Sequence, residues 1–236
     1  MINVIKSEER HHANFGWLDT RWHFSFDTYY DPNNMHWGAL RVFNDDVIAA
    51  GQGFGSHPHR DMEIITYVLE GELEHRDSQG HHGIVHPGEV QVMSAGTGVV
   101  HSEYNHSREK PVHLLQLWIS PRTPGLKPRW EQRQFTSEQR RGKLLQVVSG
   151  NGNDGALAIA QDAQIYVSSL EARQELVHHS RPNRKSYLFA ISGDLTVNGT
   201  PLTRGDQGRI ADQPELKIQA KADSEFILLD LPEMRL

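Results

Sequence analysis

The sequence predicts an all-β protein in which two β-barrel domains are joined by a short linker. Beyond residue 35, apolar segments of four to ten residues alternate with Gly, Pro, Asn and Asp, a spacing typical of β-sandwiches and barrels. Convincing helical segments are scarce. The two halves of the chain also share one order of turn motifs and apolar segments, which indicates one β-unit used twice.

Apolar segments bounded by turn residues are the expected strands. They include residues 39–43, 62–69, 89–93, 113–119, 144–148, 157–166, 187–191 and 226–231. Only the first dozen residues and residues 137–141 favour a helix. The segment 120–129 is rich in Pro and in charged residues and cannot sustain a central strand, so it is expected to be a linker.

An internal repeat sets the expected domain boundaries. In the first half Gly71-Glu-Leu is followed by a turn and then by Pro87-Gly-Glu, and in the second half Gly193-Asp-Leu is followed by Arg204-Gly-Asp. Each half then closes on an apolar strand. We therefore expect an N-terminal domain at residues 1–122, a linker at 123–143 and a C-terminal domain at 144–236.

Composition excludes several classes of function. The chain has 236 residues, no cysteine, and 24 basic against 30 acidic side chains, which gives a net charge of −6. Without cysteine there are no disulfides, zinc fingers or thiol nucleophiles, so any metal ion would have nitrogen and oxygen ligands. The acidic balance argues against direct nucleic-acid binding. No run of about 18 apolar residues and no secretory signal is visible, so we expect a cytoplasmic protein without membrane association.

Histidine is concentrated in the first half of the chain, where 13 of the 15 histidines lie at or before His113. Two strings matter most, His57-Pro-His59 and His101-Ser-Glu103. Side chains at i and i+2 of a strand point the same way, roughly 6.6 Å apart, so each pair can bind one metal ion. If the two strands are neighbours, three imidazoles and one carboxylate converge, and this ligand set suits a first-row divalent metal.

Other polar and aromatic residues have simpler structural explanations. Glu63 is expected either to hold a ligand imidazole by its second ring nitrogen or to lie on a strand surface. His113 and Gln116 are expected in the core or at the rim of the closing strand. Four histidines of a polar turn region are expected to be solvated, namely His75, His81, His82 and His86. The N-terminal aromatic residues are expected to pack in the core rather than wall a flat substrate, namely Trp17, Trp22, Phe24, Phe26, Tyr29, Tyr30 and Trp37.

The motif order around the two strings resembles that of the cupin superfamily. Gly51 is followed after five residues by His57 and His59, and Gly98 precedes His101 and Asn105 at the spacing of the second cupin motif. Seven residues separate Glu63 from Gly71 where the motif has six, and Gly96 stands where it has Pro. The strings GQGFGSHPHRDMEIITYVLEGELEHRDSQG, PGEVQVMSAGTGVVHSEYN and LLQLWIS are similar to the pirin family, in its bacterial quercetinase-like branch.

This resemblance implies a bicupin, two jelly-roll cupin domains of which only the N-terminal one binds metal. The implied ligands are His57, His59, His101 and Glu103, with iron as first choice and nickel, copper, manganese, cobalt or zinc as alternatives. The implied reaction is the 2,3-dioxygenation of a flavonol such as quercetin, which opens the central ring with loss of carbon monoxide. Glu103 is the only ionised ligand in this set, so it is the expected catalytic base.

The resemblance also implies a C-terminal cupin without a metal site. The positions that lie 14 and 12 residues before Gly193, as His57 and His59 lie before Gly71, are His179 and Arg181. One imidazole beside a guanidinium cannot hold a divalent ion.

Two other functions stay open at this point. Pirin-type proteins also include metal- or redox-responsive regulatory proteins that bind transcription machinery, and other cupins are isomerases or different small-molecule enzymes. Consumption of a flavonol together with dioxygen would favour the dioxygenase. We expect a monomer whose partners are an aromatic enol or flavonol and dioxygen.

Overall fold

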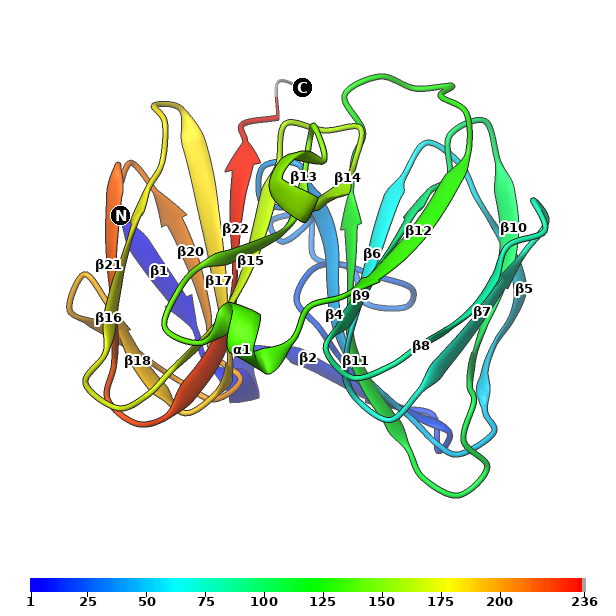
Figure 1. The fold of residues 1–236 in the computed structure, drawn as a ribbon, viewed down its shortest axis with the longest axis horizontal. Helices are drawn as coiled ribbons and strands as arrows, with labels where there is room; N and C mark the ends of the chain where they lie inside the picture. Colours follow the sequence, from blue (N-terminus) through cyan, green and yellow to red (C-terminus); the bar gives the residue numbers. More distant parts are fainter. Residues whose placement is uncertain (235–236) are drawn as a thin grey trace.

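The computed structural model describes residues 1–234 and contains two β-barrels, each made of a seven-stranded sheet that faces a four-stranded sheet (Figure 1). The large sheet of the N-terminal barrel contains β2 (His11–Asn14), β3 (Leu18–Trp22), β4 (Leu40–Ile48), β6 (Glu63–Glu70), β9 (Glu89–Ser94), β11 (Val112–Ile119) and β12 (Arg129–Gln134). Its order is β12-β9-β6-β11-β4-β3-β2. The small sheet has the order β5-β10-β7-β8 and contains β5 (Gly53–His59), β7 (Leu73–Asp77), β8 (His82–Val85) and β10 (Val99–Asn105).

The C-terminal barrel repeats this arrangement. Its large sheet contains β1 (Ile2–Ile5), β13 (Leu145–Ser149), β14 (Leu157–Ala158), β15 (Gln164–Leu170), β17 (Arg184–Ser192), β20 (Gln207–Ala211) and β22 (Ser224–Pro232), in the order β1-β20-β17-β22-β15-β13-β14. Its small sheet has the order β16-β21-β18-β19 and contains β16 (Glu175–His179), β18 (Asp194–Val197), β19 (Thr200–Thr203) and β21 (Glu215–Ala220). The helical elements in residues 1–234 are α1 (Ser137–Arg140) and two 3-10 turns at Ser7–Glu9 and Asn153–Gly155.

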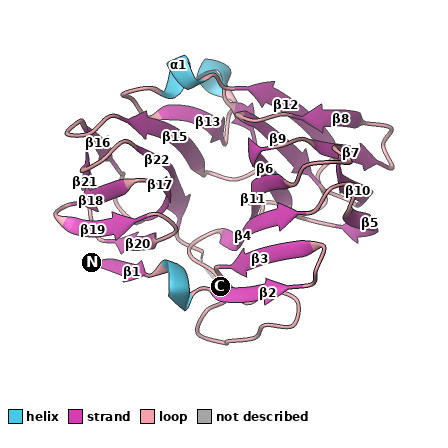
Figure 2. Cartoon of the chain, turned by 90° about the horizontal axis from the view of Figure 1, so that it is seen from below, coloured by secondary structure: helices cyan, strands magenta, loops and turns pink. Residues whose placement is uncertain are grey.

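Each barrel completes its large sheet with a strand from outside its expected part of the chain. β12 lies within residues 123–143, which were expected to be a linker, and it pairs with β9 along its whole length. β1 lies within residues 1–122 and pairs with β20 of the C-terminal barrel (Figure 2). The two barrels are therefore tied together by exchanged edge strands as well as by the connecting segment.

The internal repeat has a steric cause that is the same in both barrels. Gly71 follows β6 and Gly193 follows β17, and their φ angles are 78° and 75°. A side chain on Gly71 would meet the carbonyl oxygen of Pro111 at 2.5 Å, and one on Gly193 would meet the equivalent carbonyl of Asp223. Both turns therefore need a residue without a side chain that tolerates positive φ.

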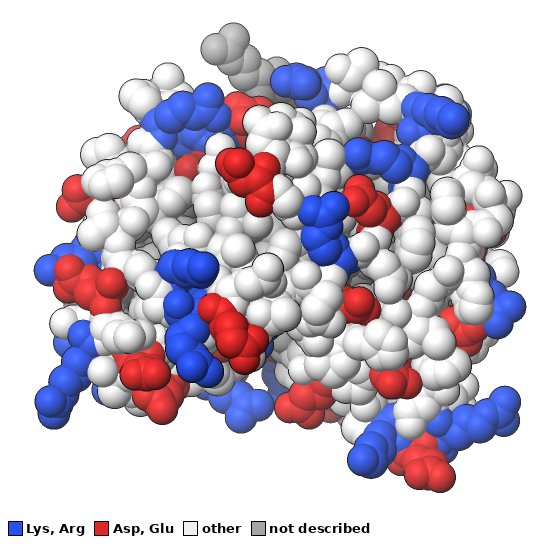
Figure 3. Space-filling model, in the orientation of Figure 1, with Lys and Arg blue, Asp and Glu red and all other residues white. Residues whose placement is uncertain are grey.

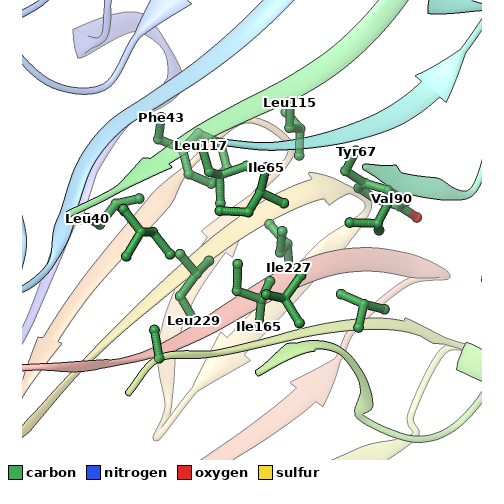
Figure 4. Close-up of a cluster of buried hydrophobic side chains, with 14 of the residues drawn as sticks. Leu40, Phe43, Ile65, Tyr67, Val90, Leu115, Leu117, Ile165, Ile227 and Leu229 are labelled. Atoms are coloured by element: carbon green, nitrogen blue, oxygen red, sulfur yellow. The ribbon is translucent and has the colours of Figure 1, made fainter. Parts of the chain in front are cut away.

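The two large sheets pack face to face and form the main apolar core (Figure 4). On β11, Leu115 and Leu117 face this core, whereas Leu114 belongs to a cluster inside the N-terminal barrel. On β22, Ile227 and Leu229 face the same core from the other side. Alternation along each strand thus gives one face to the interface between the barrels and the other face to a barrel interior.

Most of the expected strands are confirmed, as β4, β6, β9, β11, β13, β17 and β22. The helix expected near 137–141 is confirmed as α1. Of the first dozen residues, which were expected to favour a helix, only Ser7–Glu9 form a 3-10 turn. The rest of the expectation is wrong, because Ile2 and Val4 alternate toward the C-terminal core in β1 and His11 begins β2. The single strand expected at 157–166 is broken into β14 and β15, since the connecting segment bends to bond the linker. There Gln161 Nε2 donates to the carbonyl of Ser120, and the amide of Arg122 donates to the carbonyl of Ala160.

Basic and acidic side chains are interspersed on the face of the molecule that Figure 3 shows, without a continuous basic surface on that face. This distribution fits the excess of acidic residues in the sequence. None of the helices within residues 1–234 combines the length and the apolar character that a bilayer crossing requires.

Candidate metal centre

Three of the histidines singled out in the sequence meet where β5 pairs with β10, in the small sheet of the N-terminal barrel. Figure 1 shows these two strands side by side at the right of the molecule. His57 lies directly opposite His101, and their ring centroids are 4.4 Å apart. The ring of His59 lies 4.8 Å from that of His57 and 4.9 Å from that of His101. One nitrogen from each ring can be chosen so that all three lie within 4.8 Å of one another. This spacing suits a single metal ion.

Local sequence explains why the two strands approach so closely. A side chain on Gly53, at the start of β5, would meet the Cα atom of Tyr104 at 2.5 Å and collide with the carbonyl of Glu103. The register of β5 and β10 shifts between His101 and Glu103. Glu103 is nevertheless buried and lies within 4.8 Å, by a carboxylate oxygen, of nitrogens of His101 and His75.

The hydrogen bonds of His57 and His101 leave one nitrogen of each ring free. Nδ1 of His57 donates to the carbonyl of Gly55 at 2.7 Å, so Nε2 of this ring keeps its lone pair. Nε2 of His101 is buried and has no hydrogen-bond partner among the described residues. A buried unpartnered imidazole nitrogen beside two further imidazoles is the arrangement that a metal ion completes.

Burial favours the neutral form of two of these imidazoles, and this is the form in which histidine binds a metal ion. Desolvation lowers the pKa of both His59 and His101 to about 4, and the neighbouring imidazoles act in the same direction. For His101 the negative charge of Glu103 opposes the shift without cancelling it. His59 and His101 are therefore in their ligand form at neutral pH.

Glu103 is oriented by two glutamines. Gln116 Nε2 donates to one carboxylate oxygen at 2.7 Å, and Gln91 Nε2 approaches the other at 3.4 Å. Each glutamine is oriented in turn, because the indole N–H of Trp118 donates to the carbonyl oxygen of Gln116 and that of Trp130 to the carbonyl oxygen of Gln91. Both amides thus present N–H groups to Glu103.

The pKa of Glu103 reflects these neighbours. Burial alone raises it, but the nearby rings of His101 and His75 and the hydrogen bond from Gln116 together bring it below its ordinary value. The carboxylate is therefore ionised and fixed in direction.

An aromatic cavity of about 260 Å³ opens beside this cluster. Glu103 and His57 form part of its wall, and its remaining lining is Phe15, Trp17, Leu18, Trp22, Phe26, Asp27, Asn44, Asp46, Phe54, Gln116 and Trp118. The N-terminal aromatic residues thus do not all pack in the core as expected, since several line this cavity and Tyr30 is 74% exposed. Phe24 packs in the core, as expected, whereas Trp22 and Phe26 form a T-shaped pair in the cavity wall.

Two polar groups of β4 lie in the same wall. Asn44 and Asp46 are two residues apart and both are buried. The side-chain oxygen of Asn44 has no hydrogen-bond partner among residues 1–234. Burial raises the pKa of Asp46 to about 7, against the opposing effect of a hydrogen bond donated by Thr20. The cavity is therefore aromatic with a polar end.

The structure corrects the expectations for Glu63 and His75. Glu63 is buried, but it accepts a hydrogen bond from Ser94 at 2.6 Å and contacts the backbone of Ala160, so it neither holds a ligand ring nor lies on the surface. His75, expected to be solvated, is fully buried with Nδ1 at 3.4 Å from Nδ1 of His101. The burial of His75 could have been predicted from the sequence, because His75 lies two residues after Leu73 on the same face of β7, and Leu73 is buried.

The register of the small sheets identifies the equivalent positions in the C-terminal barrel. Leu73 pairs with Asn105 and Leu195 with Ala220, and each leucine stands two residues after its turn glycine. Counting along the strands, His101 and Glu103 correspond to Leu216 and Ile218. Because Leu216 pairs with His178, this residue and Ser180 correspond to His57 and His59.

The equivalents expected from spacing alone, His179 and Arg181, are therefore displaced by one residue. His178 is buried and bonds to Asp230 at 3.0 Å, and Ser180 donates to the same carboxylate. His179 is exposed.

The fold and the cluster together define a bicupin with a histidine-rich centre in its first barrel. Comparison with known families agrees, since residues 5–119 match the family Pirin and residues 146–231 match the quercetinase C-terminal cupin domain. The chain belongs to the pirin family. It is 50% identical over 98% of its length to an Escherichia coli K12 protein named quercetin 2,3-dioxygenase, of which it covers 99%. It is 44% identical to a Caulobacter vibrioides pirin-like protein, with 92% of this chain and 94% of that protein covered.

Solved structures show the same similarity. The crystal structure of YhhW from Escherichia coli has a TM-score of 0.95 and 47% identity, with full coverage of both chains. The crystal structure of the bacterial pirin YhhW in complex with nickel(II) has the same TM-score and identity and covers 99% of this chain and 100% of that one.

Proposed function

We propose that this protein is a divalent-metal-dependent dioxygenase that opens the central ring of flavonols such as quercetin. The proposed metal ligands are His57, His59, His101 and Glu103. The observation that carries the proposal is the buried, unpartnered Nε2 of His101 within a cluster of three imidazoles whose nitrogens lie within 4.8 Å of one another. The names of the relatives support the reaction, and the nickel(II) complex of YhhW supports a divalent ion.

The ligand set fits a divalent cation in chemical character. Three neutral imidazoles and one carboxylate leave a net charge near +1, which favours a monoanionic enolate as the partner. When bound, the ion supplies Lewis acidity that lowers the pKa of an enolic hydroxyl. Iron stays our first choice among the ions that accept these ligands, and element analysis of the purified protein decides it.

Glu103 is our candidate for the base that removes the enolic proton. It is ionised, its carboxylate lies within 4.8 Å of nitrogens of His101 and His75, and it forms part of the wall of the aromatic cavity. The amides of Gln116 and Gln91 both donate toward its oxygens, so a protonated Glu103 loses part of this hydrogen bonding. The glutamines therefore stabilise the ionised carboxylate, which is the form that can accept a proton. They also favour release of that proton afterwards.

The aromatic cavity suits a flat substrate. Trp17 and Phe54 form one T-shaped pair in its wall, with ring centroids 5.2 Å apart. Trp118 links this wall to the cluster, because its ring lies 4.8 Å from that of His59. Stacking and edge contacts with these rings would hold a planar flavonol beside Glu103.

Oxygen uptake with quercetin tests the proposal directly. Protein reconstituted with a known divalent metal should consume quercetin and dioxygen together, and removal of the metal by a chelator should abolish both. Glu103→Gln should retain part of the metal and lose most turnover. Glu72→Gln is the matched control, since Glu72 lies on the surface of the same barrel.

The outcomes separate the open functions. Absent turnover in metal-loaded protein would contradict the dioxygenase and leave a metal-responsive binding protein, whereas metal-dependent conversion without oxygen uptake would indicate a different cupin enzyme. Unchanged turnover in Glu103→Gln would remove the base assignment. Light scattering of the loaded protein tests the expected monomeric state.

A further inference from the structure

His101 contacts a buried series of hydrogen-bonding groups, His75 and Asp77, that have no role in the proposed reaction. Nδ1 of His101 lies 3.4 Å from Nδ1 of His75, and Nε2 of His75 lies 3.3 Å from Oδ2 of Asp77. The side chains of His75 and Asp77 are 0% and 1% exposed. Strand pairing sets this arrangement, because β7 runs beside β10 with Asp77 opposite His101 and His75 opposite Glu103.

The carboxylate of Asp77 determines which nitrogen carries the proton in the rings of His75 and His101. Asp77 only accepts: one oxygen takes the backbone N–H groups of Gln79 and His81, and the other faces the rings of His81 and His75. His75 therefore carries its proton on Nε2 and offers the lone pair of Nδ1. Only a proton on Nδ1 of His101 satisfies that lone pair, and this tautomer leaves Nε2 of His101 deprotonated.

The same geometry argues against His75 as a metal ligand itself. A second grouping of His75, His101 and Glu103 does bring ligand atoms within 4.8 Å of one another. Both ring nitrogens of His75 already face partners, whereas Nε2 of His101 faces none. His75 is thus placed to orient the ring of His101.

Packing holds this series of groups rigid. The indole of Trp130 stacks on His75 at 5.5 Å with an interplanar angle of 17°. A side chain on Gly83 would lie 2.6 Å from this indole, so glycine is needed for the indole to lie over the sheet. Because Trp130 also orients Gln91, which points at Glu103, one aromatic residue supports both the carboxylate and His101.

We propose that Asp77 and His75 are positioning residues that hold His101 in the tautomer whose Nε2 binds the metal ion. The inference rests on the proposed role of His101 as a ligand. Partners of this kind fix the orientation and raise the basicity of a ligating imidazole, and their loss weakens metal binding about 10- to 100-fold.

The test measures Co²⁺ binding by competition with a chromophoric chelator, together with the visible spectrum of the bound ion. His75→Leu removes the acceptor and should weaken binding about 10- to 100-fold and shift the spectrum. His75→Asn places an amide oxygen near the position of Nδ1 and should recover much of the affinity. Asp77→Asn keeps an oxygen for the turn but presents N–H to His75, so it should weaken binding as His75→Leu does. His82→Asn, an exposed residue of the adjacent β8, is the control.

Wild-type affinity and an unchanged spectrum in both His75→Leu and Asp77→Asn would overturn the proposal. A fourth histidine nitrogen in the pulsed EPR spectrum of the Cu²⁺-loaded unaltered protein would also overturn it, because His75 would then be a ligand beside His57, His59 and His101. If His75→Leu does not fold, as judged by circular dichroism of the metal-free protein, Asp77→Asn decides alone. Failure of the unaltered protein to bind Co²⁺ contradicts the proposed function instead, so the two failures are distinguishable.

Discussion

Replacement of Asp46 by Asn should make the protein less sensitive to alkaline pH. Asp46 lies in the wall of the aromatic cavity and is only 3% exposed. Burial is the main cause that raises its pKa, and the negative charges of Asp45 and Glu103 add to the shift. Folding therefore favours the protonated carboxyl, whereas the unfolded chain ionises it near pH 4. Asn keeps the shape and cannot ionise.

The expected magnitude follows from the pKa of about 7 in the folded protein. Below pH 4 both states are protonated and the carboxyl has no linkage effect. Between pH 4 and pH 7 the unfolded state alone is ionised, so the free energy of unfolding falls as pH rises. Above pH 7 the full penalty is about 4 kcal/mol. Between pH 5 and pH 8.5 the difference between Asp46→Asn and the parent should change by about 3 kcal/mol in favour of the variant.

Urea unfolding of chelator-treated protein at the two pH values measures this change. At each pH the free energy of unfolding of Asp46→Asn is compared with that of the parent protein. Comparing this difference at pH 5 and at pH 8.5 cancels effects of the substitution that do not depend on pH, including the altered hydrogen bond to Thr20. A difference that stays constant from pH 5 to pH 8.5 would refute the assigned burial of the carboxyl. Asp19→Asn, at a surface carboxylate paired with His12 and Arg21, serves as the control.

Three further predictions concern the turn, the ligands and their support. Gly71→Ala should lower the free energy of unfolding by more than the roughly 1–3 kcal/mol of a strained backbone conformation, because its new side chain also meets Pro111. Gly16 has a similar φ and open space around it, so Gly16→Ala is the control. Equal losses of stability in the two variants would contradict the predicted clash with Pro111. Metal-free protein should lose stability as pH falls from 6.5 toward 4, because folding holds His101 neutral while the unfolded chain binds the proton. Thermal unfolding should show a smaller loss of stability over this pH range in His101→Gln. An equal loss in the two proteins would count against the lowered pKa of His101. Gln116→Leu should cost about 2 kcal/mol, since it removes a hydrogen bond to an ionised group and leaves the indole N–H of Trp118 without that acceptor; chemical denaturation that shows no loss would contradict the role of Gln116.

The histidine cluster could be predicted from sequence because its geometry is local. His57 and His59 share a strand face by the period of two, and His101 needed only the assumption that its strand is a neighbour. Gln116 and Gln91 could not be assigned in this way. Their roles depend on which strands face Glu103 across the barrel and on two indole groups that set their amide orientation.

The exchanged edge strands were also beyond local patterns. β12 carries charged and amide side chains along both faces, so it has no apolar alternation to indicate a strand, and its pairing with β9 supplies its backbone hydrogen bonds. β1 has only four residues, and its apolar residues Ile2, Val4 and Ile5 include both the i, i+2 spacing of a strand and the i, i+3 spacing of a helix. Both strands are specified by the open edge that each barrel offers.

The two barrels show how one fold serves two purposes. In the C-terminal barrel, Leu216, Ile218 and Leu228 are fully buried together in an apolar core. The N-terminal barrel places His101 and Glu103 at the first two of these positions, so a polar layer lies there between two smaller apolar clusters. Such a layer is costly to bury unless each group has a partner. The shared core between the large sheets and the apolar C-terminal barrel supply compensating stability, which allows the first barrel to keep a cavity and an unpartnered imidazole nitrogen.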